Sequence, residues 1–221
     1  MNRRPRQFDL IAFDWDGTLF DSTGLIARCI QSACVDLGVP VPSDEAARYV
    51  IGMGLIEALQ HAVPGLPRNR YDELRERYRV HYFARQHELV LFEGTLDMLA
   101  ALKARNHWLT VATGKSRVGL DEALKTSALR GVFDATRTAD ETQSKPHPRM
   151  LLELMREFGV DPARTLMIGD TTHDLQMAVN AGVPSVAVSY GAHEPASFGE
   201  FPTLHVAHSV PDLHQWLDQH G

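Results

Sequence analysis

The chain has 221 residues, 44% of them hydrophobic, which is enough to fill one large domain or one core with a smaller second unit. Its net charge of -6 comes without a block of like charges, so nothing electrostatic favours a nucleic acid or an acidic lipid as partner. Neither a signal-peptide core nor an apolar span of membrane length appears. We therefore expect a cytoplasmic protein with no membrane or nucleic-acid partner.

The first predicted element is a short buried strand over residues 9–13, and the stretch DWDGTL follows it. Asp16-Gly17 between apolar flanks is typical of a two-residue hairpin turn, because glycine readily adopts the positive φ that such turns need. Asp14 also ends the strand, where ligands usually bind in an α/β sheet. The local pattern therefore predicts a turn, a functional site, or both.

The next segment, residues 21–92, carries helical patterns and no convincing strand. Apolar residues recur at helical spacing over residues 26–37, and a charged helical pattern covers residues 71–83. Candidate hinges lie at residues 21–24 and 92–95, where turn-forming residues gather. We therefore expect an all-helical domain inserted after the first strand.

From about residue 94 onward, strand-like and helical patterns alternate. The strand-like runs are residues 108–113, 165–169 and 185–190, and an apolar stripe at residues 151–158 predicts a helix between them. This alternation predicts βαβ units, and hence a mostly parallel sheet with helices on both faces.

The two patterns together define the expected fold class and domain organisation. The fold class is α/β, with a Rossmann-like parallel sheet core and an inserted α-helical cap domain. The core domain is expected to comprise residues 1–20 and 93–221, and the cap domain residues 21–92.

Three later stretches place polar groups after predicted strands. GDTTHD holds Asp170 and Asp174, which could equally cap the following helix and favour its positive end. VATGKS offers the Thr113 hydroxyl and the Gly114 backbone to an anion, but a nucleotide P-loop would need glycine where Leu109 stands. Lys145 precedes a helix and, taken alone, reads as a surface lysine.

If the strand ends converge, as a parallel sheet predicts, these residues lie in one pocket and a functional site becomes the favoured interpretation. The carboxylates that would share one pocket are Asp14, Asp16, Asp170 and Asp174. Carboxylates about 4 Å apart repel by about 4 kcal/mol per pair at an effective dielectric constant of about 20, so the pocket requires a cation. Oxygen-only ligands favour a hard ion such as Mg²⁺, and Lys145 and Thr113 suit a phosphoryl group.

Four motifs in this order, DWDGTL, VATGKS, Lys145 and GDTTHD, resemble those of the haloacid dehalogenase-like phosphohydrolases. The helical insert resembles the α-helical cap of the branch that contains phosphoglycolate phosphatases and β-phosphoglucomutase. The stretches FEGT, SKPHP and MAVNAGV look most like bacterial phosphoglycolate phosphatase relatives.

The resemblance implies roles for the catalytic residues. Asp14 would attack phosphorus and become an aspartyl phosphate, while Asp16 would protonate the leaving alcohol and then deprotonate water. The implied Mg²⁺ ligands are the Asp14 carboxylate, the Asp16 main-chain carbonyl, Asp170, and Asp174 directly or through water. The groups implied to hold phosphate oxygens are Thr113, the Gly114 backbone and Lys145.

Three neighbouring residues receive weaker expectations. Gly17 would allow the sharp turn, Thr18 could orient Asp16, and Trp15 is expected to pack in the core. In the cap, residues 51–55 form a plausible specificity loop, and the cap arginines would either bind an anionic substrate group or line a solvated helix face.

The expected function is a Mg²⁺-dependent phosphomonoesterase acting on a small phosphorylated metabolite, with phosphoglycolate the best single substrate. A β-phosphoglucomutase-type phosphotransferase fits the same motifs and is the nearest alternative. A non-enzymatic phospho-acceptor is a distant one, since Asp16 supplies a base that destroys the aspartyl phosphate. A monomer or a homodimer is expected.

Overall fold

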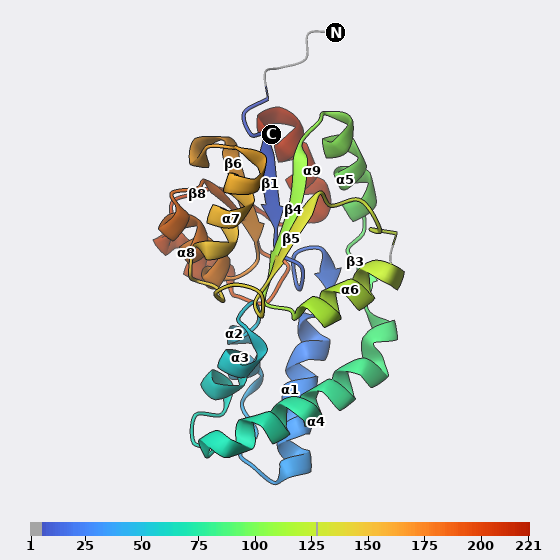
Figure 1. The fold of residues 1–221 in the computed structure, drawn as a ribbon, viewed down its shortest axis with the longest axis vertical. Coiled ribbons are helices and arrows are strands. Elements are labelled where there is room, and N and C mark those ends of the chain that lie inside the picture. The colour runs from blue at the N-terminus through green and yellow to red at the C-terminus, as the bar shows by residue number, and fades with distance from the viewer. Residues whose placement is uncertain (1–5, 127) are drawn as a thin grey trace.

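The computed structural model describes residues 6–126 and 128–221. Residues 1–5, which include the basic start of the chain and begin the predicted core segment 1–20, lie outside the described residues. Figure 1 shows two parts, a sheet flanked by helices above and a group of helices below. None of the described helices is both long and apolar enough to cross a membrane.

The upper part is built on a six-stranded sheet of order β5-β4-β1-β6-β7-β8, in which all neighbouring strands are parallel. The strands are β1 (Leu10–Phe13), β4 (Trp108–Thr113), β5 (Ala135–Thr138), β6 (Thr165–Gly169), β7 (Ser185–Val188) and β8 (Thr203–Ala207). The predicted parallel α/β sheet is confirmed. The strand order reverses at β1, and ligands bind at such switch points in open α/β sheets.

Helices cover both faces of the sheet because successive residues of β1 point to opposite sides. Ile11 and Phe13 join a hydrophobic cluster with α5 and α9, whereas Leu10 and Ala12 join another with α7 and α8. The helices of this part are α5 (Thr95–Ala104), α6 (Arg117–Thr126), α7 (Arg149–Phe158), α8 (Thr172–Ala181) and α9 (Val210–His220). Both predicted helical layers are therefore present.

The lower part contains the helices formed by residues 23–85, and it has an apolar cluster of its own. These helices are α1 (Thr23–Leu37), α2 (Asp44–Tyr49), α3 (Leu55–Ala62) and α4 (Tyr71–Arg85). They lie beyond the carboxyl end of β1, whose arrowhead points toward them (Figure 1). Short 3-10 turns cover Arg68–Arg70, Gln86–Glu88, Pro162–Arg164 and Pro195–Glu200.

Two strand expectations need correction. The segment 21–92 is not free of strands, because β2 (Phe20–Asp21) and β3 (Val90–Leu91) form an antiparallel pair where the chain enters and leaves the helices. The Asp16-Gly17 turn forms, with a φ of 85° at Gly17, but it joins no hairpin. Both edges of β1 are paired in the main sheet, one with β4 and the other with β6, so β1 cannot also pair with the segment that follows the turn.

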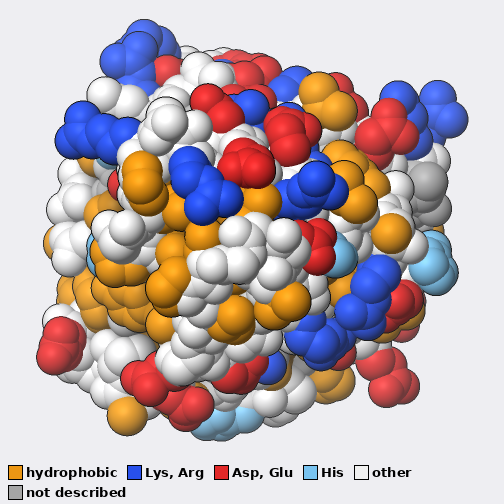
Figure 2. Space-filling model, turned by 90° about the horizontal axis from the view of Figure 1, so that it is seen from below, with side chains coloured by type: hydrophobic (Ala, Val, Ile, Leu, Met, Phe, Trp, Pro, Cys, Tyr) orange, Lys and Arg blue, Asp and Glu red, His pale blue; other side chains and the backbone are white. Residues whose placement is uncertain are grey.

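The outer face of the four helices carries mixed charge. Figure 2 views this face from below and shows Lys and Arg side chains interspersed with Asp and Glu, beside a region of hydrophobic side chains. Short ion pairs on α4, such as Arg79 to Glu76 at 3.0 Å, produce part of this mixing. The face shown presents no extended field of one sign, in agreement with the absence of charge blocks in the sequence.

Candidate active site

The site begins where β1 ends. The main-chain N–H of Asp14 donates to Ile168 of β6 at 2.8 Å, which continues the strand pairing and fixes the side chain at the sheet edge. The Asp14 carboxylate is buried, and its Oδ1 lies 2.5 Å from Nζ of Lys145. The same Nζ lies 2.6 Å from Oδ1 of Asp174. Lys145 is thus a fully buried cation between two carboxylates and not the surface lysine that its local sequence indicates.

The two carboxylates decide the charge of this lysine. Burial by itself lowers the pKa of Lys145, but the negative charges of Asp14 and Asp174 outweigh burial and raise its pKa. Burial raises the pKa of Asp14 well above its usual range despite the opposing effect of Lys145. The Lys145 ammonium therefore stays charged. The charged form of Asp14 is destabilised by its burial.

The predicted acidic residues of β1 and of GDTTHD meet in one buried cluster. Ligand oxygens of Asp14, Asp170 and Asp174 all lie within 4.8 Å of one another. Asp170 accepts hydrogen bonds from the Thr18 hydroxyl at 2.8 Å and from the Ala192 N–H at 2.7 Å. Burial, followed by the charge of Asp174, raises the pKa of Asp170 to about 7.

Asp174 has a structural role as well, since it forms a capping box with Thr171 at the start of α8. Its Oδ2 accepts from the Thr171 N–H at 3.1 Å and from the Thr171 hydroxyl at 2.7 Å. Its Oδ1 faces Lys145 instead. The capping interpretation and the site interpretation therefore both hold for Asp174, through different oxygens.

The cluster fits a hard divalent cation. Three buried carboxyl groups lie close together beside one ammonium, and burial and the neighbouring carboxylates raise the pKa of Asp14 and Asp170, so a bound cation would stabilise their ionised forms. In addition, Oδ2 of Asp14 is buried without a hydrogen-bond partner among the described residues. An unpaired buried carboxylate oxygen is costly unless a ligand binds it. An all-oxygen donor set of this kind suits Mg²⁺.

Asp16 lies apart from this cluster and has different partners. Its Oδ1 accepts from the Ser22 hydroxyl at 2.8 Å and lies 3.0 Å from Nζ of Lys115. The expectation that Thr18 orients Asp16 is therefore wrong, because the Thr18 hydroxyl bonds to Asp170. Ser22, which directly precedes α1, donates to Asp16 instead. The carbonyl contact of Asp16 with the ion stays a prediction.

Lys115 is the residue that the sequence reasoning missed. Its Nζ donates to the Tyr82 hydroxyl of α4 at 2.7 Å as well as pairing with Asp16. Burial lowers the pKa of Lys115, but the Asp16 carboxylate and Tyr82 together outweigh burial and raise it. The signal was available, because Lys115 follows Thr113 and Gly114 directly and must share their sheet edge.

Thr113 and Gly114 lie at the carboxyl end of β4, as predicted for phosphate contacts. Both line a cavity of about 620 Å³ that Asp14 and Asp16 also line. A side chain at Gly114 would meet the main-chain oxygen of Gly52 at 2.6 Å, and that of Met53 as well. Glycine is therefore required here by the close approach of the loop before α3.

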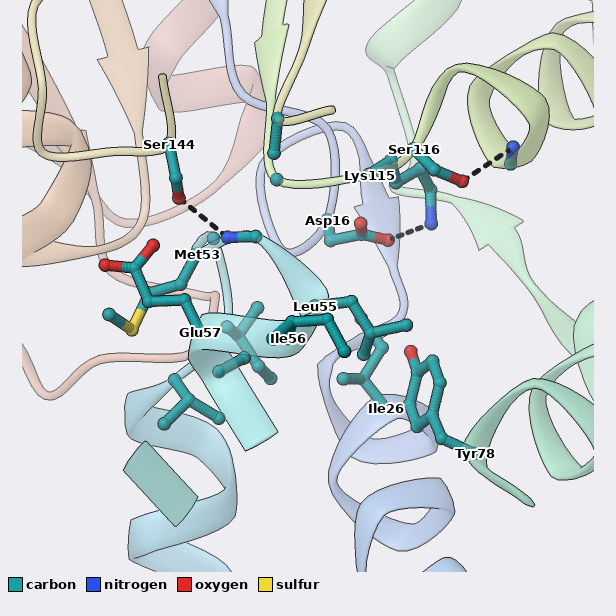
Figure 3. A pocket seen from close by; sticks show the side chains of 18 of the residues that line it. Asp16, Ile26, Met53, Leu55, Ile56, Glu57, Tyr78, Lys115, Ser116 and Ser144 are labelled. Carbon is teal, nitrogen blue, oxygen red and sulfur yellow. Dashed lines mark hydrogen bonds and ion pairs between the residues drawn. The ribbon is translucent and has the colours of Figure 1, made fainter. Parts of the chain in front are cut away.

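The predicted specificity loop over residues 51–55 closes this cavity from the helical side. The N–H of Gly54 donates to the Ser144 hydroxyl at 2.7 Å, a contact drawn in Figure 3. Just before the loop, the main-chain oxygen of Tyr49 accepts from Nε2 of His173 at 2.7 Å and of His193 at 2.9 Å. These contacts hold the helices over the sheet edge.

Comparison with known proteins agrees with these observations. The sequence profile of the haloacid dehalogenase-like hydrolases matches residues 11–188. The chain is 36% identical over 197 residues to "Probable phosphatase IndB" of Dickeya dadantii, covering 83% of this chain and 82% of that protein. It is 32% identical over 199 residues to a phosphoglycolate phosphatase of Aliivibrio fischeri, covering 85% and 88%.

A solved structure described as a predicted phosphoglycolate phosphatase from Haemophilus somnus aligns over 96% of this chain and 99% of that chain, with a TM-score of 0.86 and 26% identity. The family match includes DWDGTL, VATGKS, Lys145 and GDTTHD, which the fold brings to one sheet edge. The chain therefore belongs to the haloacid dehalogenase-like hydrolase family, on its phosphoglycolate phosphatase-like branch of phosphatases.

Proposed function

We propose that the protein hydrolyses phosphate monoesters in a Mg²⁺-dependent reaction that passes through an aspartyl phosphate on Asp14. One observation carries the proposal: the Asp14 carboxylate is held by Lys145 through one oxygen, has no hydrogen-bond partner among the described residues at the other, and lines the cavity. A carboxylate prepared in this way is a nucleophile with a fixed orientation. The family membership supports the same chemistry.

The first half of the proposed reaction transfers the phosphoryl group to the protein. The Asp14 carboxylate attacks phosphorus, the bond from phosphorus to the leaving oxygen breaks, and Asp16 gives that oxygen a proton. In the second half, a water molecule attacks phosphorus, Asp16 takes its proton, and phosphate leaves Asp14. Asp16 lines the same cavity and is held by Ser22 and Lys115, so its position is defined in both halves.

The remaining polar groups neutralise and position the phosphoryl group. Thr113, the Gly114 N–H and Lys145 would bind its oxygens, because phosphoryl transfer depends mainly on positioning and charge stabilisation. Asp14, Asp170 and the Asp16 carbonyl would hold Mg²⁺, with Asp174 supporting the site. The ion would add positive charge next to the transferred group.

The proposed substrate is a small-molecule phosphate ester. Phosphoglycolate is the ester that the sequence predicts, and the named relative from Aliivibrio fischeri supports testing it first. The cavity beside Asp16 also has room for larger leaving groups, so the assay must include sugar phosphates, nucleoside monophosphates and simple alkyl phosphates.

The test measures phosphate release from this panel of esters with Mg²⁺ and with a chelator. We expect release that requires the ion, and we expect Asp14→Asn and Asp16→Asn each to lower kcat by at least about a hundredfold without lowering Tm. The matched control is Asp21→Asn, which changes an exposed aspartate outside the cavity and should retain full activity. Near-normal rates in either site variant would contradict the mechanism. Transfer to a sugar without phosphate release would instead favour the mutase.

A further inference from the structure

The cavity above Asp14 and Asp16 has a different character on its other side. There its wall is formed by side chains of α1, α3 and α4, namely Ile26, Ile30, Leu55, Ile56, Tyr78 and Tyr82. In Figure 3, Ile26, Leu55, Ile56 and Tyr78 lie across the cavity from Asp16 and Lys115. A group attached to a phosphoryl group at Asp14 would therefore meet hydrocarbon and aromatic surface.

The cations along this cavity already have carboxylate partners. Nζ of Lys115 lies 3.0 Å from Oδ1 of Asp16 and also donates to the Tyr82 hydroxyl. The lining residues Arg75 and Arg79 pair with carboxylates of their own helix, each at 3.0 Å. Among the described lining residues, no cation is left without a partner for a carboxylate on the leaving group.

The one acidic side chain that α3 contributes to the lining makes an anionic leaving group still less favourable. Glu57 lines the cavity, is exposed, and in Figure 3 its carboxylate points away from Asp16. It adds negative charge to a wall whose described cations all have carboxylate partners. An apolar group has no hydrogen bonds to water to give up on entering such a space, whereas a carboxylate would lose hydration without gaining a partner.

Size points in the same direction. A cavity of about 620 Å³ lies in the range that holds drug-sized ligands, and the glycolate group of phosphoglycolate would leave most of it unfilled. Apolar walls stabilise a ligand in proportion to the apolar area that it buries. A longer or cyclic hydrocarbon portion would use this wall, while glycolate would not.

We infer that the site selects phosphate esters whose leaving group is neutral and apolar, an aliphatic chain or ring that fills the cavity against α1, α3 and α4. This inference rests on the proposed function and deepens it, because it assigns a substrate class to the same site. We assign Ile56 a role in substrate specificity. Its side chain lines the cavity but is not part of the apolar cluster of the helices, so it contacts the leaving group without being needed for that cluster.

The first experiment uses n-alkyl phosphates from ethyl to hexyl phosphate, with phosphoglycolate as the anionic comparison. The alkyl leaving groups have nearly equal acidity, so a change in kcat/KM reports binding of the chain. We expect kcat/KM to rise by up to about fourfold per added methylene, and hexyl phosphate to exceed phosphoglycolate. A flat series with phosphoglycolate preferred would overturn the inference and leave hydrolysis intact. Failure to release phosphate from any ester would contradict the proposed function itself, and with it the inference.

The second experiment compares Ile56→Arg with Val80→Arg. The first places a free cation on the apolar wall, and the second adds the same charge to α4 at a residue that is 59% exposed and outside the lining. We expect Ile56→Arg to lower kcat/KM for hexyl phosphate by about tenfold and to raise it for phosphoglycolate, and Val80→Arg to change neither. Equal effects of the two variants would overturn the inference. If Ile56→Arg does not fold, Ile56→Ala must reduce the dependence on chain length.

Discussion

Asp14 and Asp16 are separated by one residue, yet the fold gives them different surroundings. Asp14 shares a buried cluster with Lys145, Asp170 and Asp174, while Asp16 pairs with Lys115 on the wall of the same cavity. Two carboxylates in unlike environments can serve one reaction in two roles, as nucleophile and as acid and base. At the scale of single residues, this difference is the physical basis of the proposed mechanism.

Lys115 gives a prediction at this scale. Lys115→Met removes the cation from Asp16 and the donor to Tyr82, so we expect kcat to fall by about tenfold or more. Tyr82→Phe removes only the hydroxyl contact and should raise KM by a few fold with little change in kcat. Steady-state kinetics of both variants provides the measurement. A loss in kcat as large for Tyr82→Phe as for Lys115→Met would show that Lys115 does not act through Asp16.

The residues of the site were largely predictable because each follows a strand. Asp14, Thr113 and Asp170 come at strand ends, and a parallel sheet brings such ends to one edge. Lys115 could also have been placed at this edge, because it directly follows Thr113 and Gly114. The contacts of Asp16 with Ser22 and Lys115, and of Lys115 with Tyr82, were not predictable in the same way. They depend on the path of the turn after β1 and on the placement of α4, which local sequence does not encode.

The strands differ in how strongly their sequences predict a strand. β1, β4, β6 and β7 are interior strands buried almost throughout, so their sequences are mostly apolar. β5 and β8 are the edge strands, and their sequences ATRT and TLHVA mix polar and apolar residues at partly exposed positions. Half-solvated edges lose the apolar signal, which is why both strands were missed.

The contact between α2 and the loops of the sheet yields a prediction at the scale of elements. Nδ1 of His193 accepts from the Thr172 N–H at 3.0 Å, so its Nε2 carries a proton and donates to the Tyr49 carbonyl. His193→Phe leaves both backbone groups without this partner. We expect the free energy of unfolding to fall by about 1–3 kcal/mol, measured by urea denaturation.

The control for this experiment is His87→Phe, which makes the same change at an exposed position in the 3-10 turn after α4. It should leave the denaturation midpoint unchanged. Equal midpoints for the two variants would show that the His193 contacts contribute nothing to stability.

At the scale of the whole molecule, the helices α1 to α4 close over the switch point of the sheet and turn an open edge into a cavity (Figure 1). Helical periodicity predicted these elements, but their placement depends on long-range contacts such as Gly54 to Ser144 and Gly114 to the loop before α3. The boundary of this part at residues 21 and 92 stays a prediction.

The buried carboxylates predict how ion binding affects the stability of the whole chain. Burial and then Asp174 raise the pKa of Asp170 from 3.8 to about 7, so the folded state holds a proton that the unfolded state has released. Without Mg²⁺, the contribution of Asp170 to stability therefore falls as pH rises from about 4 toward 7. The ion competes with that proton, and its binding strengthens as Asp170 ionises.

We therefore expect Mg²⁺ to raise Tm, and to raise it more at about pH 8 than at about pH 6. Thermal denaturation with and without the ion at both values gives the comparison. In Asp170→Asn the rise in Tm on adding Mg²⁺ should largely disappear at both pH values. A gain in Tm that is independent of pH, or retained in the variant, would contradict binding of the ion at this cluster.

A covalent phosphoryl group on Asp14 is what the proposed function most directly requires. The decisive measurement is mass spectrometry of protein quenched in acid during turnover of an active ester, with the peptide that contains Asp14 analysed for one added phosphoryl group. We predict the modification at Asp14 in the unaltered protein and none in Asp14→Asn. Turnover with no modified peptide, or with the phosphoryl group on another residue, would contradict the proposed mechanism.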